Sequence, residues 1–183
     1  MWDPFEQTVK TFGQNNLIRA NPKAVRKLKI PKRSKKFLIE IGLPKEKILL
    51  CEFDLNLDEF PTIQEYAQKN NRSIQCDRLF RRIGYDGGTH ICISEENESG
   101  EIFVVDLKGE LPTAFVNSNI ETFAGFLALY VEACRNYGEV TESEMIDGAH
   151  EFDKKLRDLD PPAFRDEETW WSCITEQLKC GML

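Results

Sequence analysis

Apolar positions follow a helical period near both ends of the chain and a strand-like pattern in its middle. At the start, Asp3 followed by Pro4 is typical of a helix N-terminus, and the expected helix ends at Gly13. Asn21 before Pro22 predicts a second short helix. The stretch "SKKFLIEIG" predicts a third, which its closing glycine terminates.

In the middle of the chain, short apolar runs alternate with turn-forming clusters, which predicts a sheet. The expected strands lie in "KILLCEFDL", at residues 77–83, in "THICIS", in "EIFVVDL" and at residues 113–116. Asp86-Gly87 in "YDGG" is a strong hairpin signal, because glycine supplies the positive φ angles of a tight turn. Since these glycines lead into a strand and not a helix, we interpret them as a turn rather than a phosphate-binding loop.

Beyond Asn117 the apolar period becomes helical again. Ser118 and Glu121 have the spacing of a capping box, and Gly138 is the expected end of the helix that follows them. Thr141 and Glu144 form a second capping box before another amphipathic helix. This part of the chain is therefore expected to be entirely helical.

The stretch "DPP" at residues 160–162 interrupts the helical period, and Asp166 is the expected N-cap of a last helix. Helices, then a meander, then helices is the order of an α+β domain. We expect a single mixed, mostly antiparallel sheet with helices packed on one side and at the ends. No repeat or linker divides the chain, so residues 1–183 should form one domain, with a C-terminal helical segment at about 140–183.

Charge is distributed unevenly along this acidic chain, whose formal net charge is −7. Residues 1–50 carry twelve Lys and Arg against four Asp and Glu, whereas residues 51–183 carry twelve against 27. The excess of carboxylates argues against direct nucleic-acid binding and suits a basic protein partner. Eight cations between Lys23 and Lys36 are interpreted as a solvated helical face, with an anion or partner contact as the alternative.

No feature of the sequence directs the chain to a membrane or into a secretion pathway. There is no run of about 20 apolar residues, and "MWDPFEQTVKTFGQNN" lacks the cationic start and apolar centre of a secretory signal. We therefore expect a cytoplasmic protein without a membrane partner. Its six cysteines form no CxxC pair, so they are expected to be free thiols, and no cofactor is expected.

His90 and Cys92 are candidates for a chemical site, because residues two apart on a strand share one face. A metal would need further ligands, and no spacing selects Cys51, Cys76 or His150 for that role. A cysteine nucleophile would need a hydrogen-bonded base and a third, orienting group, which the pattern does not mark. We interpret both residues as packing residues and assign no catalytic or metal-binding residue, with a thiol or metal enzyme as the weaker hypothesis.

The candidate partner-binding residues are acidic or aromatic. Glu95, Glu96 and Glu98 lie in the polar turn between two expected strands, and Asp86 lies in the hairpin, so these residues are expected at one end of the sheet. A carboxyl group needs an apolar setting to act as an acid near neutral pH. In a polar turn we instead expect solvated carboxylates that contact a basic partner.

Trp170 and Trp171 are the aromatic candidates. Neighbours on a helix point about 100° apart, so one is expected to dock the last helix and the other to be partly exposed as an interface anchor. The alternative is that both pack under the Pro161-Pro162 segment.

Several longer motifs are found along the chain: "FLIEIGLPKE", "RRIGYDGGTHICI" with "GEIFVVD", "FVNSNIETFAGFLALY", and "WW" with "EQL" near the end. Together they resemble the SUKH superfamily of bacterial immunity proteins, most closely its fourth subgroup. The matching positions are Gly42, Leu43, Pro44, Ile83, Gly84, Asp86, Gly88, Gly100, Phe115, Val116, Asn117, Ser118, Phe123 and Leu127. The resemblance covers nearly the whole chain, and its motifs are mainly structural.

The resemblance implies a non-enzymatic cytoplasmic antidote that binds the toxin domain of a polymorphic toxin, often a nuclease or nucleic-acid deaminase. Occlusion of a basic nucleic-acid groove by an acidic inhibitor requires no chemistry from the inhibitor. The alternative is a regulatory interaction module, since the yeast cell-wall-assembly regulator shares the same domain. No catalytic residue is carried over from the family.

Overall fold

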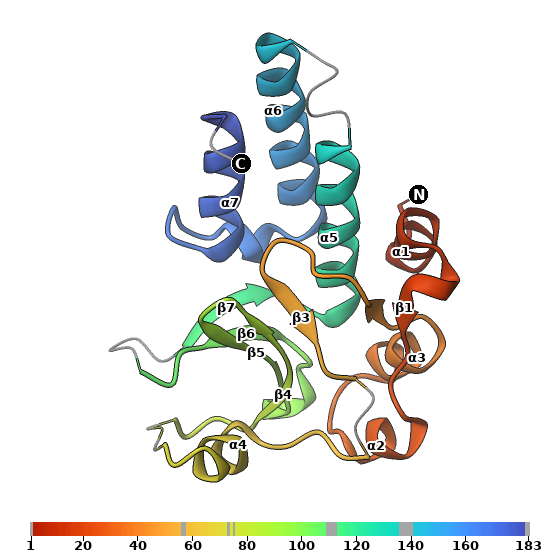
Figure 1. The fold of residues 1–183 in the computed structure, drawn as a ribbon, viewed down its shortest axis with the longest axis vertical. Coiled ribbons are helices and arrows are strands. Elements are labelled where there is room, and N and C mark those ends of the chain that lie inside the picture. The colour runs from red at the N-terminus through yellow and green to blue at the C-terminus, as the bar shows by residue number, and fades with distance from the viewer. Residues whose placement is uncertain are drawn as a thin grey trace.

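The computed structural model describes residues 2–55, 58–72, 74, 76–108, 113–135 and 141–181, and they form the expected α+β fold (Figure 1). The helices are α1 (Pro4–Phe12), α2 (Pro22–Lys27), α3 (Lys32–Glu40), α4 (Ile63–Lys69), α5 (Ile120–Cys134), α6 (Glu142–Leu159) and α7 (Trp170–Lys179), with short 3-10 turns η1 (Gln14–Asn16), η2 (Glu96–Glu98) and η3 (Pro161–Phe164). The strands are β1 (Leu17–Ile18), β2 (Leu43–Pro44), β3 (Cys51–Phe53), β4 (Phe80–Asp86), β5 (Thr89–Ser94), β6 (Ile102–Val105) and β7 (Thr113–Asn117).

The helix α1 begins and ends where the sequence predicts, and α2 begins at its predicted start, whereas α3 begins at Lys32, two residues before the predicted stretch. The Asp3 carboxylate accepts the backbone N–H of Phe5 at the start of α1, and Asn21 caps α2. Gly42 follows α3 with φ at +86°, and a Cβ there would collide with the carbonyl oxygen of Ile18. A glycine is therefore required at this position for β1 and β2 to approach and pair.

The main sheet is an antiparallel meander in the order β3-β4-β5-β6-β7. The predicted hairpin is confirmed, since Asp86 pairs with Thr89 across a two-residue turn in which Gly87 has φ of +51°. β4 begins at Phe80, three residues after the expected start at Asp77. Phe80 pairs with Ser94, the last residue of β5, so the preceding residues have no strand to pair with.

A β-bulge in β4 decides which side chains share a face of the sheet. The register shifts between Arg82 and Gly84, so that Arg82 lies opposite Cys92 and Tyr85 lies opposite His90. Without the extra residue, Arg82 and Tyr85 would point to opposite faces, because they are three apart. The bulge thus places Arg82, Tyr85, His90 and Cys92 on one face.

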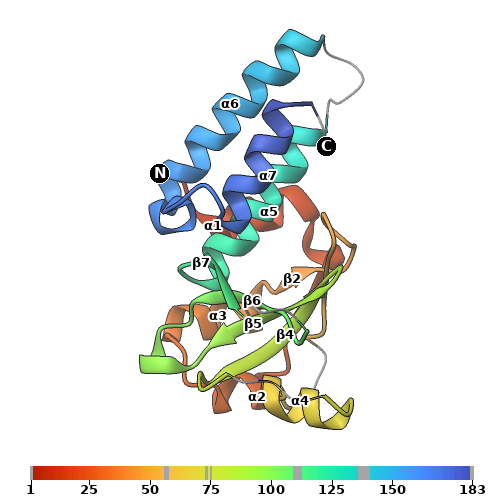
Figure 2. The ribbon, with the colours of Figure 1, turned by 90° about the vertical axis from the view of Figure 1, so that its left-hand side faces the viewer.

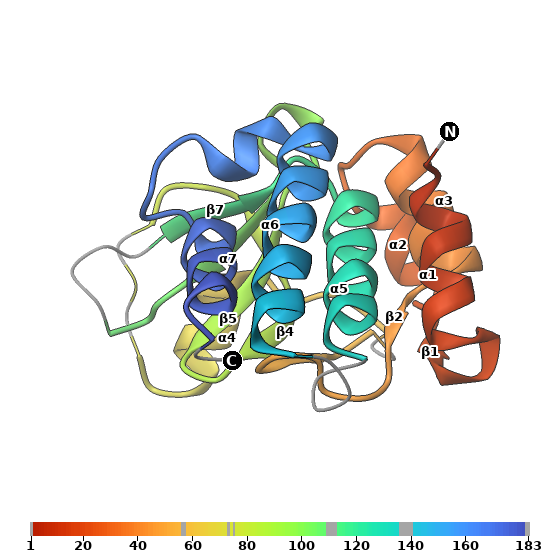
Figure 3. The ribbon, with the colours of Figure 1, turned by 90° about the horizontal axis from the view of Figure 1, so that it is seen from above.

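The other face of the sheet is covered by a helical layer. Figures 2 and 3 show α7, α6, α5 and α1 side by side on that face. The ring of Phe123 on α5 lies 6.0 Å from that of Phe53 on β3. This arrangement confirms helices packed on one side of the sheet. On the opposite face, α4 is the one described helix after the N-terminal helices (Figure 2).

The helix α4 was not predicted, although its start carries a clear signal. Thr62 and Glu65 form a capping box in which each side chain accepts the other's backbone N–H. Only two residues of this helix, Ile63 and Ala67, are fully buried, so its apolar period is too short to stand out in the sequence.

The start of α5 differs from the prediction. Its N-cap is Asn119, whose side chain accepts the backbone N–H of Thr122, and not Ser118. Glu121 is buried and accepts a hydrogen bond from Ser34 on α3 instead of closing a capping box. The predicted end of this helix at Gly138 lies outside the described residues.

In the C-terminal segment the capping box of Thr141 and Glu144 at the start of α6 is confirmed. The last helix begins at Trp170 with Thr169 at its N-cap, not at Asp166 as expected. The backbone carbonyl of Asp166 accepts hydrogen bonds from the hydroxyls of Thr169 and Ser172, so this residue belongs to the loop before the helix.

A buried hydrogen-bond network joins the sheet to the C-terminal helices. Asp160, at the end of α6, accepts from the side-chain amide of Asn117 at 2.9 Å and from the hydroxyl of Ser118 at 2.6 Å. The oxygen of the same Asn117 amide accepts from the indole N–H of Trp171 at 2.8 Å. The "FVNS", "DPP" and "WW" stretches therefore meet in one place, where Asn117, Asp160 and Trp171 connect the C-terminal helices to the sheet.

Candidate functional site

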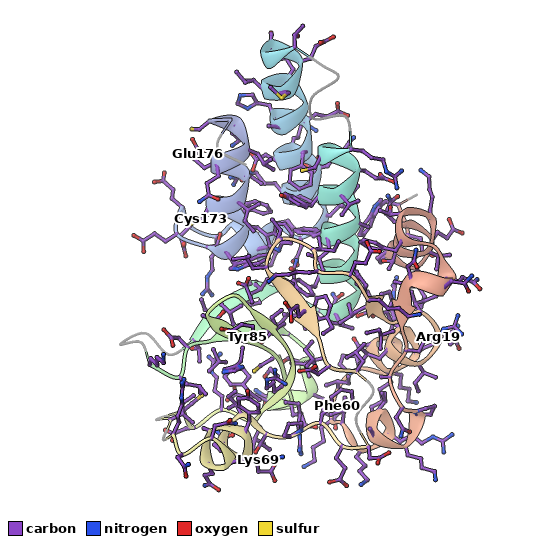
Figure 4. All side chains as sticks on the ribbon, in the orientation of Figure 1. Arg19, Phe60, Lys69, Tyr85, Cys173 and Glu176 are labelled. Atoms are coloured by element: carbon purple, nitrogen blue, oxygen red, sulfur yellow. The ribbon has the colours of Figure 1, made fainter. Side chains whose placement is uncertain are left out.

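A polar hollow of about 640 Å³ lies on the open face of the sheet, between β4–β5 and α4. Figure 4 shows Tyr85 on the sheet and Lys69 on α4 at the two sides of this region. The residues that line the hollow are mostly charged or aromatic: Glu52, Asp54, Tyr66, Asn70, Arg72, Arg82, Tyr85, Gly87, Gly88, His90, Leu107 and Lys108. Its size lies in the range of small-molecule sites.

Arg82 is the central side chain of the hollow and is about 10% exposed. One terminal nitrogen donates to the Asp54 carboxylate at 2.6 Å, and Nε donates to Nδ1 of His90 at 3.2 Å. The guanidinium also lies over the ring of Tyr66, 4.4 Å from its centroid. These contacts hold a buried cation in a fixed orientation between the sheet and α4.

His90 is uncharged at neutral pH. Burial lowers the pKa of its imidazole to about 4, and the positive charges of Arg82 and Arg72 act in the same direction. Because Nδ1 accepts a hydrogen bond from Arg82, the single ring proton resides on Nε2. Among the described residues, the lining of the hollow holds three cations, Arg72, Arg82 and Lys108, against two carboxylates, Glu52 and Asp54, although the protein as a whole is negative.

His90 and Cys92 do share a face, as predicted, but they do not form a nucleophile and base. Burial raises the pKa of the Cys92 thiol, so the nucleophilic thiolate is disfavoured. The hydrogen bond of His90 goes to Arg82 and not to this sulfur. Within the described ranges, no group of three or more His, Cys, Asp or Glu side chains is arranged to hold a metal ion.

The mouth of the hollow carries the exposed cations Arg72 and Lys108. Of the two acidic residues in the lining, Asp54 pairs with Arg82 and Glu52 pairs with Lys47. Within the part of the chain that the structure describes, Arg72 and Lys108 form no ion pair. Sequence reasoning missed this cluster, and the capping box before α4 was the one local signal that could have placed Tyr66 opposite the sheet.

The acidic turn after β5 is only partly solvated, which corrects the expectation for Glu95. This carboxylate is 6% exposed, accepts the backbone N–H of Lys29 at 2.7 Å and pairs with Arg81 at 2.8 Å. It therefore links α2–α3 to the sheet. Glu96 and Glu98 are exposed as expected, with Glu96 in a half-exposed ion pair with Arg78.

Trp170 and Trp171 differ in solvent exposure, as the first interpretation predicts. Trp171 is fully buried and docks α7, whereas Trp170 is half-buried. The indole N–H of Trp170 donates to Asp86 at 3.0 Å, across the tip of the β4–β5 hairpin. Burial raises the pKa of the Asp86 carboxyl, which this hydrogen bond opposes. Both indole rings pack against the hydrophobic core, and the role of Trp170 as a partner anchor stays a prediction.

Two further expectations about the chain can be compared with the structure. All six cysteines are free thiols, as predicted. Among the described helices, none combines the length and the apolar character that crossing a bilayer requires.

The chain was also compared with known proteins. The family model described as SUKH-4 immunity protein matches residues 4–177, which includes every strand of the sheet and most of α7. No curated protein and no solved structure matches the chain. The matched range, residues 4–177, includes the β4–β5 hairpin and all the motifs that meet in the Asn117–Asp160–Trp171 network. The chain therefore belongs to the SUKH-4 immunity protein family.

Proposed function

We propose that this protein is a non-enzymatic, cytoplasmic immunity protein that binds the toxin domain of a polymorphic toxin and blocks it by covering its active site. Membership of an immunity protein family supports a toxin partner in general. The finer proposal, that the toxin acts on nucleic acid as a nuclease or deaminase, is carried by the charge distribution. Residues 51–183 hold 27 Asp and Glu against twelve Lys and Arg, which is complementary to a groove that binds phosphates.

The acidic turn is the proposed contact surface, with Glu96 and Glu98 as its accessible carboxylates. Both are exposed, and they project from η2 beyond the end of the sheet. Glu95 supports the turn from inside and does not reach a partner. Asp86 and half-buried Trp170 form a second accessible patch at the hairpin tip, which Trp171 supports from the core.

Association kinetics test this surface. The protein is to be co-purified with the toxin domain encoded beside its gene, and Glu96→Lys with Glu98→Lys is compared with the parent chain. We expect the association rate at low salt to fall about tenfold and the difference to shrink as salt is added, because exposed charges steer encounter and are screened. A matched double variant, Glu40→Lys with Glu46→Lys, makes the same charge change on exposed residues elsewhere. An equal loss in both variants would remove the turn as the contact surface.

The competing function is a regulatory interaction module with no toxin partner. Co-expression separates the two, because an immunity protein restores growth to cells that produce the neighbouring toxin domain. If the purified chain neither binds that domain nor protects the cells, the module is favoured.

A further inference from the structure

The hollow beside Arg82 is a defined cavity of the fold. The acidic turn, which is the proposed toxin contact, forms no part of its lining. The acidic turn follows the last residue of β5, Ser94, whereas the hollow lies beside His90 and the β4–β5 hairpin. Arg82 is about nine-tenths buried and is oriented by three contacts, with Asp54, His90 and Tyr66. These contacts occupy the guanidinium, so Arg82 fixes the floor of the cavity and leaves the binding of an anion to other cations.

Among the residues that the structure describes, two cations of the hollow have no carboxylate partner. Asp54 balances Arg82, and Glu52 is paired with Lys47. Arg72 and Lys108 at the mouth form no ion pair with the residues that the structure describes, and two unit charges match a phosphate monoester dianion. Burial lowers the pKa of His90, Arg82 and Arg72 lower it further and Asp106 opposes them, so the uncharged imidazole adds no third positive charge to the hollow.

The inner lining of the hollow consists mainly of aromatic and hydrogen-bonding side chains and not of aliphatic ones. Tyr66, Tyr85 and His90 form an aromatic group in which the ring of His90 lies 4.8 Å from that of Tyr66 and 5.5 Å from that of Tyr85. The Nε2–H of His90 and the tyrosine hydroxyls can bond to sugar or base atoms. The volume of about 640 Å³ accommodates a molecule the size of a nucleoside monophosphate.

From this geometry we infer that the hollow is a binding site for a small phosphate monoester of the nucleotide class. The phosphate lies at the mouth between Arg72 and Lys108, and the organic part lies inward against Tyr85 and His90. This site is separate from the acidic turn but adjoins the hairpin that carries Asp86. Its test needs no toxin, so it holds or fails independently of the immunity function.

The test uses AMP as the probe and the ring signals of His90 as the reporter. The chain has two histidines, so a His150→Asn variant leaves His90 as the single imidazole in the proton NMR spectrum. At pH 7.5, AMP should shift the His90 signals to saturation. Adenosine and inorganic phosphate should each bind more weakly than AMP, because each lacks one half of the ligand.

The matched variants are Arg72→Gln with Lys108→Gln at the mouth, and Lys23→Gln with Lys32→Gln as the control. All four residues are exposed, and each pair removes two positive charges, so folding and net charge are matched. The first pair should weaken AMP binding at least about tenfold, as expected for lost charge-assisted contacts, and the control pair by less than about twofold.

Several outcomes would overturn the inference. One is no saturable change at His90, and another is an equal loss of AMP affinity in both double variants. Adenosine or inorganic phosphate binding as tightly as AMP also contradicts it. An acetylated Asp-Glu peptide that binds the hollow more tightly than AMP would show that it receives a carboxylate side chain of a protein partner instead.

Discussion

Glu95 and Glu98 show how carboxylates three residues apart in one polar turn take different roles. Both were expected to be solvated contact residues, but Glu95 is enclosed by Lys29 and Arg81, whereas Glu98 remains exposed. The difference depends on α2–α3, which is distant in sequence and lies beside the turn only in the folded chain. A partner can therefore reach Glu98 but not Glu95.

At the residue scale, we predict that Glu95→Ala lowers the free energy of unfolding by about 3 kcal/mol. The substitution leaves the backbone N–H of Lys29 and the Arg81 guanidinium without their acceptor. Glu98→Ala should change it by about 0.5 kcal/mol or less, because that side chain is exposed. Urea unfolding of both variants measures the two changes in unfolding free energy. Equal changes would show that Glu95 has no structural role.

The lowered pKa of the buried His90 imidazole is expected to make the stability of the protein depend on pH. That pKa is about 4 in the folded chain against an ordinary value of 6.5, so between these values the unfolded chain binds the extra proton. Stability from this group is therefore complete above pH 6.5 and is lost as the pH falls toward 4. Between pH 7.5 and 5 the loss is about 2 kcal/mol.

The measurement is the difference in unfolding free energy between the parent chain and His90→Gln at each pH. Glutamine keeps an acceptor for Arg82 but does not titrate, and the subtraction cancels carboxyl groups with raised pKa values such as Asp86 and Glu121. A difference that stays constant from pH 7.5 to pH 5 would contradict the buried neutral imidazole.

At the scale of elements, the junction between β7 and α5 depends on Asp160 at the end of α6. Its carboxylate accepts hydrogen bonds from Asn117, from the backbone and hydroxyl of Ser118, and from Thr122. Since Asn117 also receives the Trp171 indole, one buried carboxylate orients three helices relative to the sheet. The "FVNS" stretch and Trp171 can thus be explained by packing, without a partner.

We expect Asp160→Ala to destabilise the chain by about 4 kcal/mol, because it removes a buried charged acceptor from four donors. The control is Asp158→Ala, two residues earlier on α6, whose carboxylate forms an exposed pair with Lys154 and should contribute about 0.5 kcal/mol or less. Thermal and urea unfolding compare the two. A loss for Asp160→Ala no larger than that of the control would mean that the junction does not depend on this carboxylate.

At the scale of the whole molecule, the contacts between the layers favour one cooperative unit. Phe123 packs on Phe53 of the sheet, and Trp171 lies 5.1 Å from Phe126 and is hydrogen-bonded to β7. A helical layer with these contacts has no separate core. The single domain with a C-terminal helical segment stays a prediction, which cooperative unfolding can test.

We therefore predict that sheet and helices unfold at the same urea concentration. Tryptophan fluorescence reports the helical layer through Trp171, and the His90 proton signals report the open face of the sheet. Coincident midpoints are the expected two-state result. A fluorescence midpoint at clearly lower urea would show that residues 141–181 form a separate unit.

Local sequence signals were sufficient for many of the elements. Asp3-Pro4, Asn21-Pro22, Thr141 with Glu144 and the Asp86-Gly87 turn act within a few residues, so their structural effect is independent of the rest of the chain. The N-cap at Asn119 was missed because Ser118 has a competing interaction with Asp160, about 40 residues away, that local rules do not include.

The sequence by itself thus determined the order of the elements, the antiparallel central hairpin and the acidic balance of residues 51–183, because these depend on local periodicity, turn chemistry and composition. The tertiary structure alone decided which side chains meet. One extra residue in β4 turns Arg82 and Tyr85 to the same face, and α4 then closes the hollow over them. The burial of Glu95 likewise required the approach of α2–α3. Both outcomes depend on strand register and long-range packing, which a linear pattern of residues does not encode locally.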